Sequence, residues 1–306
     1  MDFMLLFVYP EIPKISLAAE ELFSVGPVKF TNSNLMMFIV MIAVSVFLIG
    51  STRKLTTIPG RRQAFVELMV ESLRNFTAAT SGNARLSRNI FPLVTTLFVF
   101  ILCANYSGLL PGVGSITLKK DVHVPASVDV AALSPEEIKA EHIIQKEGVY
   151  YYHDEKIPLL RSPNADLNMT LALAVIVVIL VQIIGIQTNG VGGYLSEFKN
   201  PLAFVEVFSR ILSLSMRLFG NVFGGEVLVT VMYALTYAFV PALFLLIELF
   251  FGAVQAFVFI TLTIIYLALA ATTHHGGHEA HEEAHESPRG EGLVSDRAAA
   301  PLAGGD

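Results

Sequence analysis

The fold is decided by residues 241–272, PALFLLIELFFGAVQAFVFITLTIIYLALAAT, where Glu248 is the one charged residue. A helix needs ~20 consecutive apolar residues to cross the hydrocarbon core of a bilayer. This run exceeds that length, so we predict a membrane-spanning helix here.

Four further apolar runs lie at residues 35–50, 90–113, 167–188 and 201–240. Composition agrees, because 54% of the 306 residues are hydrophobic and 15% are charged, against ~25% charged in soluble domains. The mean hydropathy is +0.62. We therefore predict an all-α membrane protein with about five transmembrane helices in one domain, residues 31–272. A net charge of -6 gives no basic face for a nucleic-acid partner.

An amphipathic helix is predicted between the first two spans, over residues 61–88. Its apolar side recurs at helical spacing and its charged residues lie on other faces. The apolar side consists of Phe65, Leu68, Met69, Ser72, Leu73 and Phe76. We expect this helix to lie on the membrane surface.

Basic residues set the expected orientation. Residues 51–89 contain seven lysines and arginines, whereas residues 1–34 contain two. The positive-inside rule then places the N-terminal segment, residues 1–30, outside the membrane and the C-terminus in the cytoplasm. Asp2, where a signal peptide would be basic, favours a mature terminal segment.

Two polar segments flank the later spans. The external loop, residues 114–163, includes SPEEIKAEHIIQKEG at residues 134–148, for which a short helix capped by Ser134 and Glu137 is predicted. Residues 273–306 are rich in histidine and acidic residues and low in complexity, so we expect a disordered tail. The single cysteine, Cys103, cannot form a disulfide within the chain.

Charged residues inside the last two apolar runs are the candidates for function. Each costs ~2.5 to 3.5 kcal/mol at membrane depth, which favours a pathway with water or partners nearby. The alternative is a set of ion pairs that satisfy one another. The candidate residues are Glu206, Arg210, Arg217, Glu226 and Glu248.

Helical spacing separates the two arginines. Glu206 lies four residues before Arg210, the favourable order for an ion pair, whereas Arg217 has no acidic residue three or four positions away. Glu226 points away from the face that holds Arg217, at 100° per residue. On the last run, Glu248 and Gln255 are seven residues apart and share one face.

Four motifs carry a family resemblance. SLSMRLFGNVFGGE at 213–226 and VQAFVFITLTIIYLALA at 254–270 resemble the signature helices of subunit a of F-type ATP synthases. NYSGLLPG at 105–112 and PNADLNMTLALA at 163–174 are similar to earlier helices of that family.

The resemblance implies a fold and a function. The last two helices are expected to be long, tilted and packed against a rotating c-ring, with two half-channels that lead protons to ring carboxylates. Such a subunit couples the proton-motive force to ATP synthesis without a nucleotide site, cofactor or metal of its own. Its implied partners are the c-ring, the stator b subunits, the rest of the ATP synthase and the lipid bilayer. A bacterial plasma membrane and protons as the coupling ion are the favoured expectations.

Roles carry over by position. Arg217 matches the essential arginine, with Asn221 and Gln255 as polar companions, and Glu226 and Glu248 match the outer half-channel. The supporting positions are Arg210, Glu206, Asp166 and Asn168. Two features depart from the family: Gly108 stands where some bacterial relatives have aspartate, and the loop over residues 115–161 is long.

Two other interpretations compete with this one. An unrelated polytopic ion transporter would show internal repeats with paired broken helices, and no repeat is seen between the halves. HEEAH at residues 281–285 matches a zinc-protease pattern, but it lacks the apolar flanks of a packed helix. A solvated acidic tail explains that stretch better.

Overall fold

The computed structural model describes residues 19–26, 28–53, 55–114, 116–123, 142–146, 149–197, 201–236 and 239–272. The chain divides into two units, Met1–Ala271 and Thr272–Asp306, and the described helices and strands belong to the first. The expected disordered tail and its HEEAH stretch lie outside the described residues.

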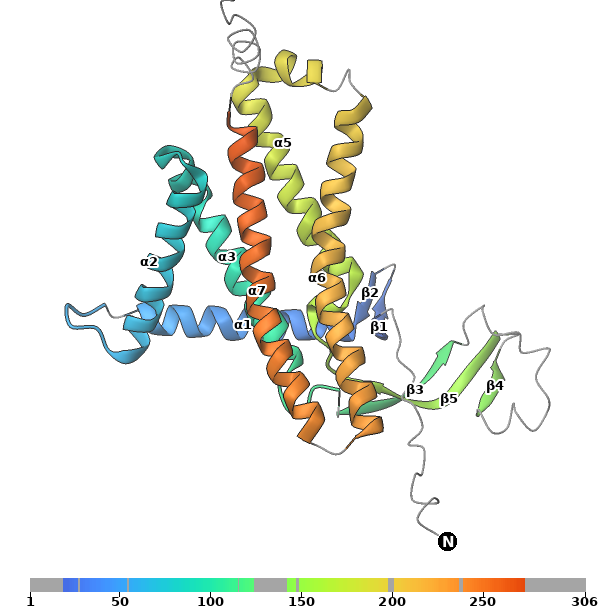
Figure 1. Ribbon diagram of the computed structural model, residues 1–306. Helices are drawn as coiled ribbons and strands as arrows, with labels where there is room; N and C mark the ends of the chain where they lie inside the picture. The colour runs from blue at the N-terminus through green and yellow to red at the C-terminus, as the bar shows by residue number, and fades with distance from the viewer. Residues whose placement is uncertain are drawn as a thin grey trace, which may run out of the picture. The chain divides into compact units, whose positions relative to one another are not determined.

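Six α-helices make up most of the described part of the first unit (Figure 1). Their bounds are α1 Asn32–Thr52, α2 Arg61–Ser81, α3 Ala84–Gly108, α5 Leu167–Glu197, α6 Pro201–Leu235 and α7 Phe239–Ala270, with a short 3-10 turn, η2, at Pro163–Ala165. α5 is broken at Gly190, whose φ of 70° lies in the left-handed region that glycine tolerates.

Four of these helices are long and apolar enough to cross a membrane. They comprise Asn32–Thr52, Ala84–Gly108, Leu167–Gly192 and Val240–Ala270. This confirms the helical membrane class. Among the residues described, α6 does not meet the same criteria, and it carries the four charged side chains at positions 206, 210, 217 and 226. Its crossing of the membrane stays a prediction.

A single apolar core joins α3, α5, α6 and α7. Fully buried side chains from all four helices meet in it, among them Ile101, Val177, Leu218 and Ile264. Because lipid tails are as apolar as leucine, close packing and dispersion forces hold such a core together more than water exclusion does. The interlocked core fixes how α6 and α7 lie against each other.

The predicted surface helix ends earlier than expected. α2 stops at Ser81 because Gly82 has a φ of 63°, a left-handed C-cap. Asn83 then starts α3, and its Oδ1 accepts from the backbone N–H groups of Arg85 and Leu86 at 2.9 and 3.2 Å. Arg85 therefore belongs to the first turn of α3, and the expectation of one helix over residues 61–88 was wrong.

The protein-facing side of α2 also differs in part from the expected apolar stripe. Leu73 is buried, together with Val66, whereas Phe65 and Leu68 are exposed. The sequence pattern marks an apolar side, but it does not separate residues that face other helices from residues that face lipid.

Strands flank the helices in two places. The hairpin of β1 Glu21–Val25 and β2 Val28–Thr31 precedes α1, and β3 Thr117–His123, β5 Val149–Pro158 and β4 Ile143–Lys146 form an antiparallel sheet in that order. The helix expected over residues 134–148 is wrong at residues 143–146, because Ile143 and Ile144 pair across strands with Tyr152 and Tyr151. His142, with a φ of 52°, is not helical either, and residues 134–141 and 147–148 lie outside the described part of the chain.

The base of this sheet is tied to the helices. Asn32, fully buried at the start of α1, donates from Nδ2 to the carbonyl of Pro158 at 3.1 Å. The backbone ladder continues with Leu159 N–H to Ile116 O at 2.8 Å and Gly114 N–H to Leu160 O at 3.3 Å. The segment that follows β5 is thereby held against the end of α3.

Packing in the core predicts different effects at adjacent positions of α5. Val177→Ala removes atoms from a fully buried site and should destabilise the helical unit by about 1–2 kcal/mol, since the cavity that it leaves is not refilled. Ile176 is 49% exposed, so Ile176→Ala should have a smaller effect although it removes more atoms. The measurement is the temperature at which half of the protein aggregates in heated membranes. An equal shift for both variants would contradict the packing.

Candidate functional site

Arg210 is held between α6 and α7. Its guanidinium pairs with Glu206 one turn earlier on α6, as the spacing predicted. Its Cζ also lies 4.7 Å from the ring centroid of Tyr266 on α7, which is a cation–π distance. Arg210 is therefore compensated by residues of this chain.

Arg217, two turns further along α6, is exposed and is not compensated in this way. Its Nη2 donates weakly to the hydroxyl of Ser213 at 3.4 Å. In the described ranges no carboxylate forms an ion pair with it. Its neighbours on the exposed face are apolar or small, such as Leu212, Met216 and Gly220. A cation on such a face needs an anion or water from outside the chain.

Glu226 pairs with an arginine that sequence reasoning missed. Nε of Arg161 lies 3.4 Å from Oε2 of Glu226. Arg161 stands between β5 and η2, its side chain is 5% exposed, and its Cζ lies 5.7 Å from the ring centroid of Phe223. The available signal was a single basic residue directly before the SPNADLN stretch, at the end of the long loop.

Glu248 of α7 approaches α6 at a glycine. A Cβ at Gly225 would lie 2.5 Å from Oε1 of Glu248 and 2.6 Å from its Cδ, closer than real Cβ atoms come to their neighbours. Only the absence of a side chain at Gly225 allows this approach. Because Gly225 is next to Glu226, the two carboxylates that the sequence singled out come to one place.

Glu226 and Glu248 line one cavity of ≈ 600 Å³. Its walls come from the ends of α3 and α6, the start of α7 and the base of the sheet, and include Asn105, Gly112 and Pro158. The cavity is thus a place where water can meet both carboxylates, whereas Arg217 is not among its lining residues. A carboxylate in contact with water exchanges protons, which a guanidinium does not do.

Gly108 also lines this cavity and has no room for a side chain. A Cβ at Gly108 would lie 2.9 Å from the Cβ of Ser162, whose hydroxyl donates to the carbonyl of Ala104 at 3.0 Å. An aspartate at this position would require the Ser162 segment to move. The departure from some bacterial relatives at Gly108 is therefore matched by the packing around it.

A buried network of amide side chains lies next to the cavity and includes Asn105 of its lining. Nδ2 of Asn164 in η2 donates to Oδ1 of Asn105 at 2.7 Å, and Nδ2 of Asn105 donates to the carbonyl of Gly252 in α7 at 2.9 Å. Gly252 lies one turn after Glu248. These bonds join α3, η2 and α7, and so fix the part of α7 that carries the carboxylate.

The remaining predicted residues are dispersed. Asp166, 4% exposed, accepts from the backbone N–H of Asn168 at 2.9 Å and so caps α5, while Asn168 itself is exposed. Gln255 is buried, and its Nε2 has no hydrogen-bond partner in the described structure. Asn221 is half-buried on α6. No hydrogen bond among the described residues links Gln255 or Asn221 to Arg217.

Comparisons with known proteins agree with the motifs. The family described as ATP synthase A chain matches residues 34–268. "ATP synthase subunit a" of Moorella thermoacetica is 31% identical over 254 residues, which cover 81% of this chain and 94% of that protein. The protein of the same name from Gloeobacter violaceus is 30% identical and covers 78% of this chain and 83% of its own.

A third relative, from Geobacter sp. (strain M21), is 29% identical over 75% of this chain and 83% of its own, and it is also named "ATP synthase subunit a". The comparisons give no support to the alternative of an unrelated ion transporter. Since the family match spans most of the described helices, this chain belongs to the ATP synthase A chain family.

Proposed function

We propose that this chain is the stator subunit that leads protons to and from the rotating c-ring of an F-type ATP synthase. The observation that carries this proposal is the contrast between two sites: an exposed Arg217 on α6 without an anionic partner among the described residues, and a cavity of ≈ 600 Å³ with two carboxylates between α6 and α7. Arg217 needs a mobile anion, and the carboxylates of the cavity can transfer protons.

The missing anion is a ring carboxylate. A guanidinium attracts the ionised form of a carboxylate and stabilises it by charge-assisted hydrogen bonds, so a ring site must lose its proton before it passes Arg217. The fixed cation also repels protons in transit and cannot relay one itself. Asn221 and Gln255 assist as polar neighbours on the same two helices.

The cavity is the outer half-channel. The basic segment over residues 51–89 leads into the start of α3, and the cavity lies at the other end of that helix, near Gly108. With the basic segment in the cytoplasm, the cavity faces outside. The N-terminus is then outside and the C-terminus inside a bacterial plasma membrane.

Glu226 and Glu248 have different roles in proton transfer. Arg161 forms an ion pair with Glu226, so Glu226 is committed to a partner within this chain. Glu248 has no ion pair among the described residues and lies against Gly225 of α6, so it is the group that takes up and releases the proton. Glu206, Asp166 and Asn168 have structural roles as a partner for Arg210 and as the cap of α5.

Length supports the tilt expected of α6 and α7. A helix of 35 residues, as in α6, is about 50 Å long, whereas the hydrocarbon core is ~30 Å thick. Tilted helices present a long face to the ring. The stator b subunits and the rest of the synthase are the further partners.

The energy comes from the membrane potential. Each proton that descends it supplies ~2.3 kcal/mol per 100 mV. The ring adds up these contributions as rotation, and nucleotide chemistry takes place elsewhere in the complex.

The two arginines should differ sharply on substitution. Arg217→Ala removes the cation that deprotonates the ring site, so ATP synthesis in inverted vesicles should fall to background, and Arg217→Lys should also couple poorly because it loses the planar fork. Arg210→Ala should keep partial activity, since an exposed pair contributes ~0 to 1 kcal/mol. A working Arg217→Ala enzyme would refute the proposed function, and equal impairment by Arg210→Ala would refute the pairing argument.

The carboxylates should also be unequal. Glu248→Gln removes the proton carrier and should slow passive proton conductance in vesicles by about a hundredfold, the lower end of the usual scale for a positioned acid–base group. Glu226→Gln should have a smaller effect, because Glu226 is already committed to Arg161. The double variant should resemble Glu248→Gln and still assemble. Parental conductance in the double variant would show that the cavity is not the half-channel.

Gly225→Ala should slow passive proton conductance by turning the Glu248 carboxyl group away from α6, while assembly is kept. The added Cβ would lie 2.5 Å from Oε1 and 2.6 Å from Cδ, and the end of a flexible side chain turns away at little cost. Gly50→Ala on α1, where a Cβ meets no atom within 4 Å, is the control. The measurement is proton conductance in vesicles that contain equal amounts of the complex, and parental conductance in Gly225→Ala would contradict the close approach.

A further inference from the structure

A second, separate pocket of ≈ 380 Å³ lies between α3, α5 and α7, where the first turns of α3 meet the last turns of α7. Leu267 and Ala271 line it from α7, at the opposite end of that helix from Glu248. The volume falls in the ~300–1,000 Å³ range of small-molecule sites. The proton pathway proposed above does not use it.

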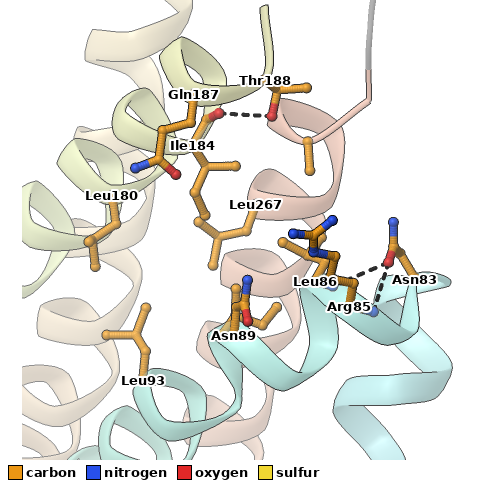
Figure 2. Close-up of a pocket in the computed structure, with 12 residues that line it drawn as sticks. Asn83, Arg85, Leu86, Asn89, Leu93, Leu180, Ile184, Gln187, Thr188 and Leu267 are labelled. Atoms are coloured by element: carbon orange, nitrogen blue, oxygen red, sulfur yellow. Dashed lines mark hydrogen bonds between the residues drawn. The ribbon is translucent and has the colours of Figure 1, made fainter.

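The pocket is polar at one end and apolar at the other (Figure 2). Arg85, Asn89 and Gln187 line the polar end, whereas Leu93 and Leu180 line the apolar end. Leu180 precedes Gln187 by seven residues, so the apolar end lies about 10 Å deeper along α5. A ligand that fills both ends has a polar head and a hydrocarbon portion.

Charge selects the head group. No acidic residue lines the pocket, and across the ranges that the structure describes the Arg85 guanidinium makes no ion pair. The amide groups of Asn89 on α3 and Gln187 on α5 add neutral donors to the wall of the pocket. A guanidinium with amide donors is suited to a phosphate, because charge-assisted hydrogen bonds to phosphate oxygens are strong.

Position selects the source of the phosphate. The polar end lies at the start of α3, which follows the basic segment over residues 51–89, so it opens at one surface of the membrane. Basic pockets between transmembrane helices recognise anionic lipid head groups. A partner helix does not fit, since a helix about 10 Å across fills such a volume within about one turn.

We propose that this pocket binds one anionic phospholipid, with the phosphate at Arg85 and part of an acyl chain against Leu93, Leu180 and Leu267. The lipid bridges three helices at the end of α7 that is remote from the carboxylates. Through its contacts with all three helices, the lipid holds the end of α7 against α3 and α5.

The test uses the whole purified synthase with photoreactive phosphatidylglycerol that carries a diazirine on its acyl chain. Labelled peptides of this subunit are identified by mass spectrometry. We expect labelling in the peptides around Leu93 and Leu180, well above that by the matching phosphatidylcholine. Arg85→Gln should reduce the phosphatidylglycerol label about fivefold, the scale of one arginine near an anionic lipid, and Arg85→Lys should keep most of it.

Arg88→Gln is the matched control. Arg88 is exposed on the same helix and does not line the pocket, so its loss should leave the label unchanged. Leu180→Phe, which fills the apolar end, should reduce the label with Arg85 intact. An equal loss in Arg88→Gln would mean general surface attraction, and competition by inorganic phosphate would mean a soluble-anion site. Either result, or full labelling of Arg85→Gln, would overturn the proposal.

Discussion

A charged side chain at membrane depth must be paired, hydrated or met by a partner, and this constraint organises the chain around α6. Arg210 is paired with Glu206 and lies over Tyr266, so it is satisfied within the chain. Glu226 is paired with Arg161, which the base of the β3–β5 sheet delivers from the long loop. Arg217 is left on an exposed face without an anion among the described residues. The ring carboxylate of the proposed function would supply the anion that Arg217 lacks.

Small residues make this arrangement possible. Gly225 admits the carboxyl group of Glu248, Gly108 admits the Ser162 segment, and Gly252 lies against Asn105 and Tyr106. In a bilayer, where apolar contact between helices gains little from water exclusion, close backbone approach and hydrogen bonds supply specific association. Gly225 and Gly252 therefore allow α7 to lie close to α6 and α3, and Gly108 lines the cavity beside them.

α7 joins two sites of different character. At its beginning it contributes Glu248 to a cavity that holds two carboxylates, and at its end it contributes Leu267 to a pocket with one arginine and amide side chains. The buried network of Asn164, Asn105 and the Gly252 carbonyl anchors the first end. The proposed lipid anchors the second. A helix fixed at both ends can hold its middle turns steady against a moving partner.

The sequence by itself determined the helical membrane class, the order of the helices and the contrast between the two arginines, because apolar length and helical spacing are local properties. It also pointed to Glu226 and Glu248 through their isolation in apolar runs. Only the tertiary structure decided that Arg161 meets Glu226, that residues 143–146 form a strand, and that Gly82 ends α2. The first two depend on pairing between segments far apart in the chain, and the third on a backbone angle that glycine permits but does not require. The spacing of residues along one helix carries no information on any of these three features.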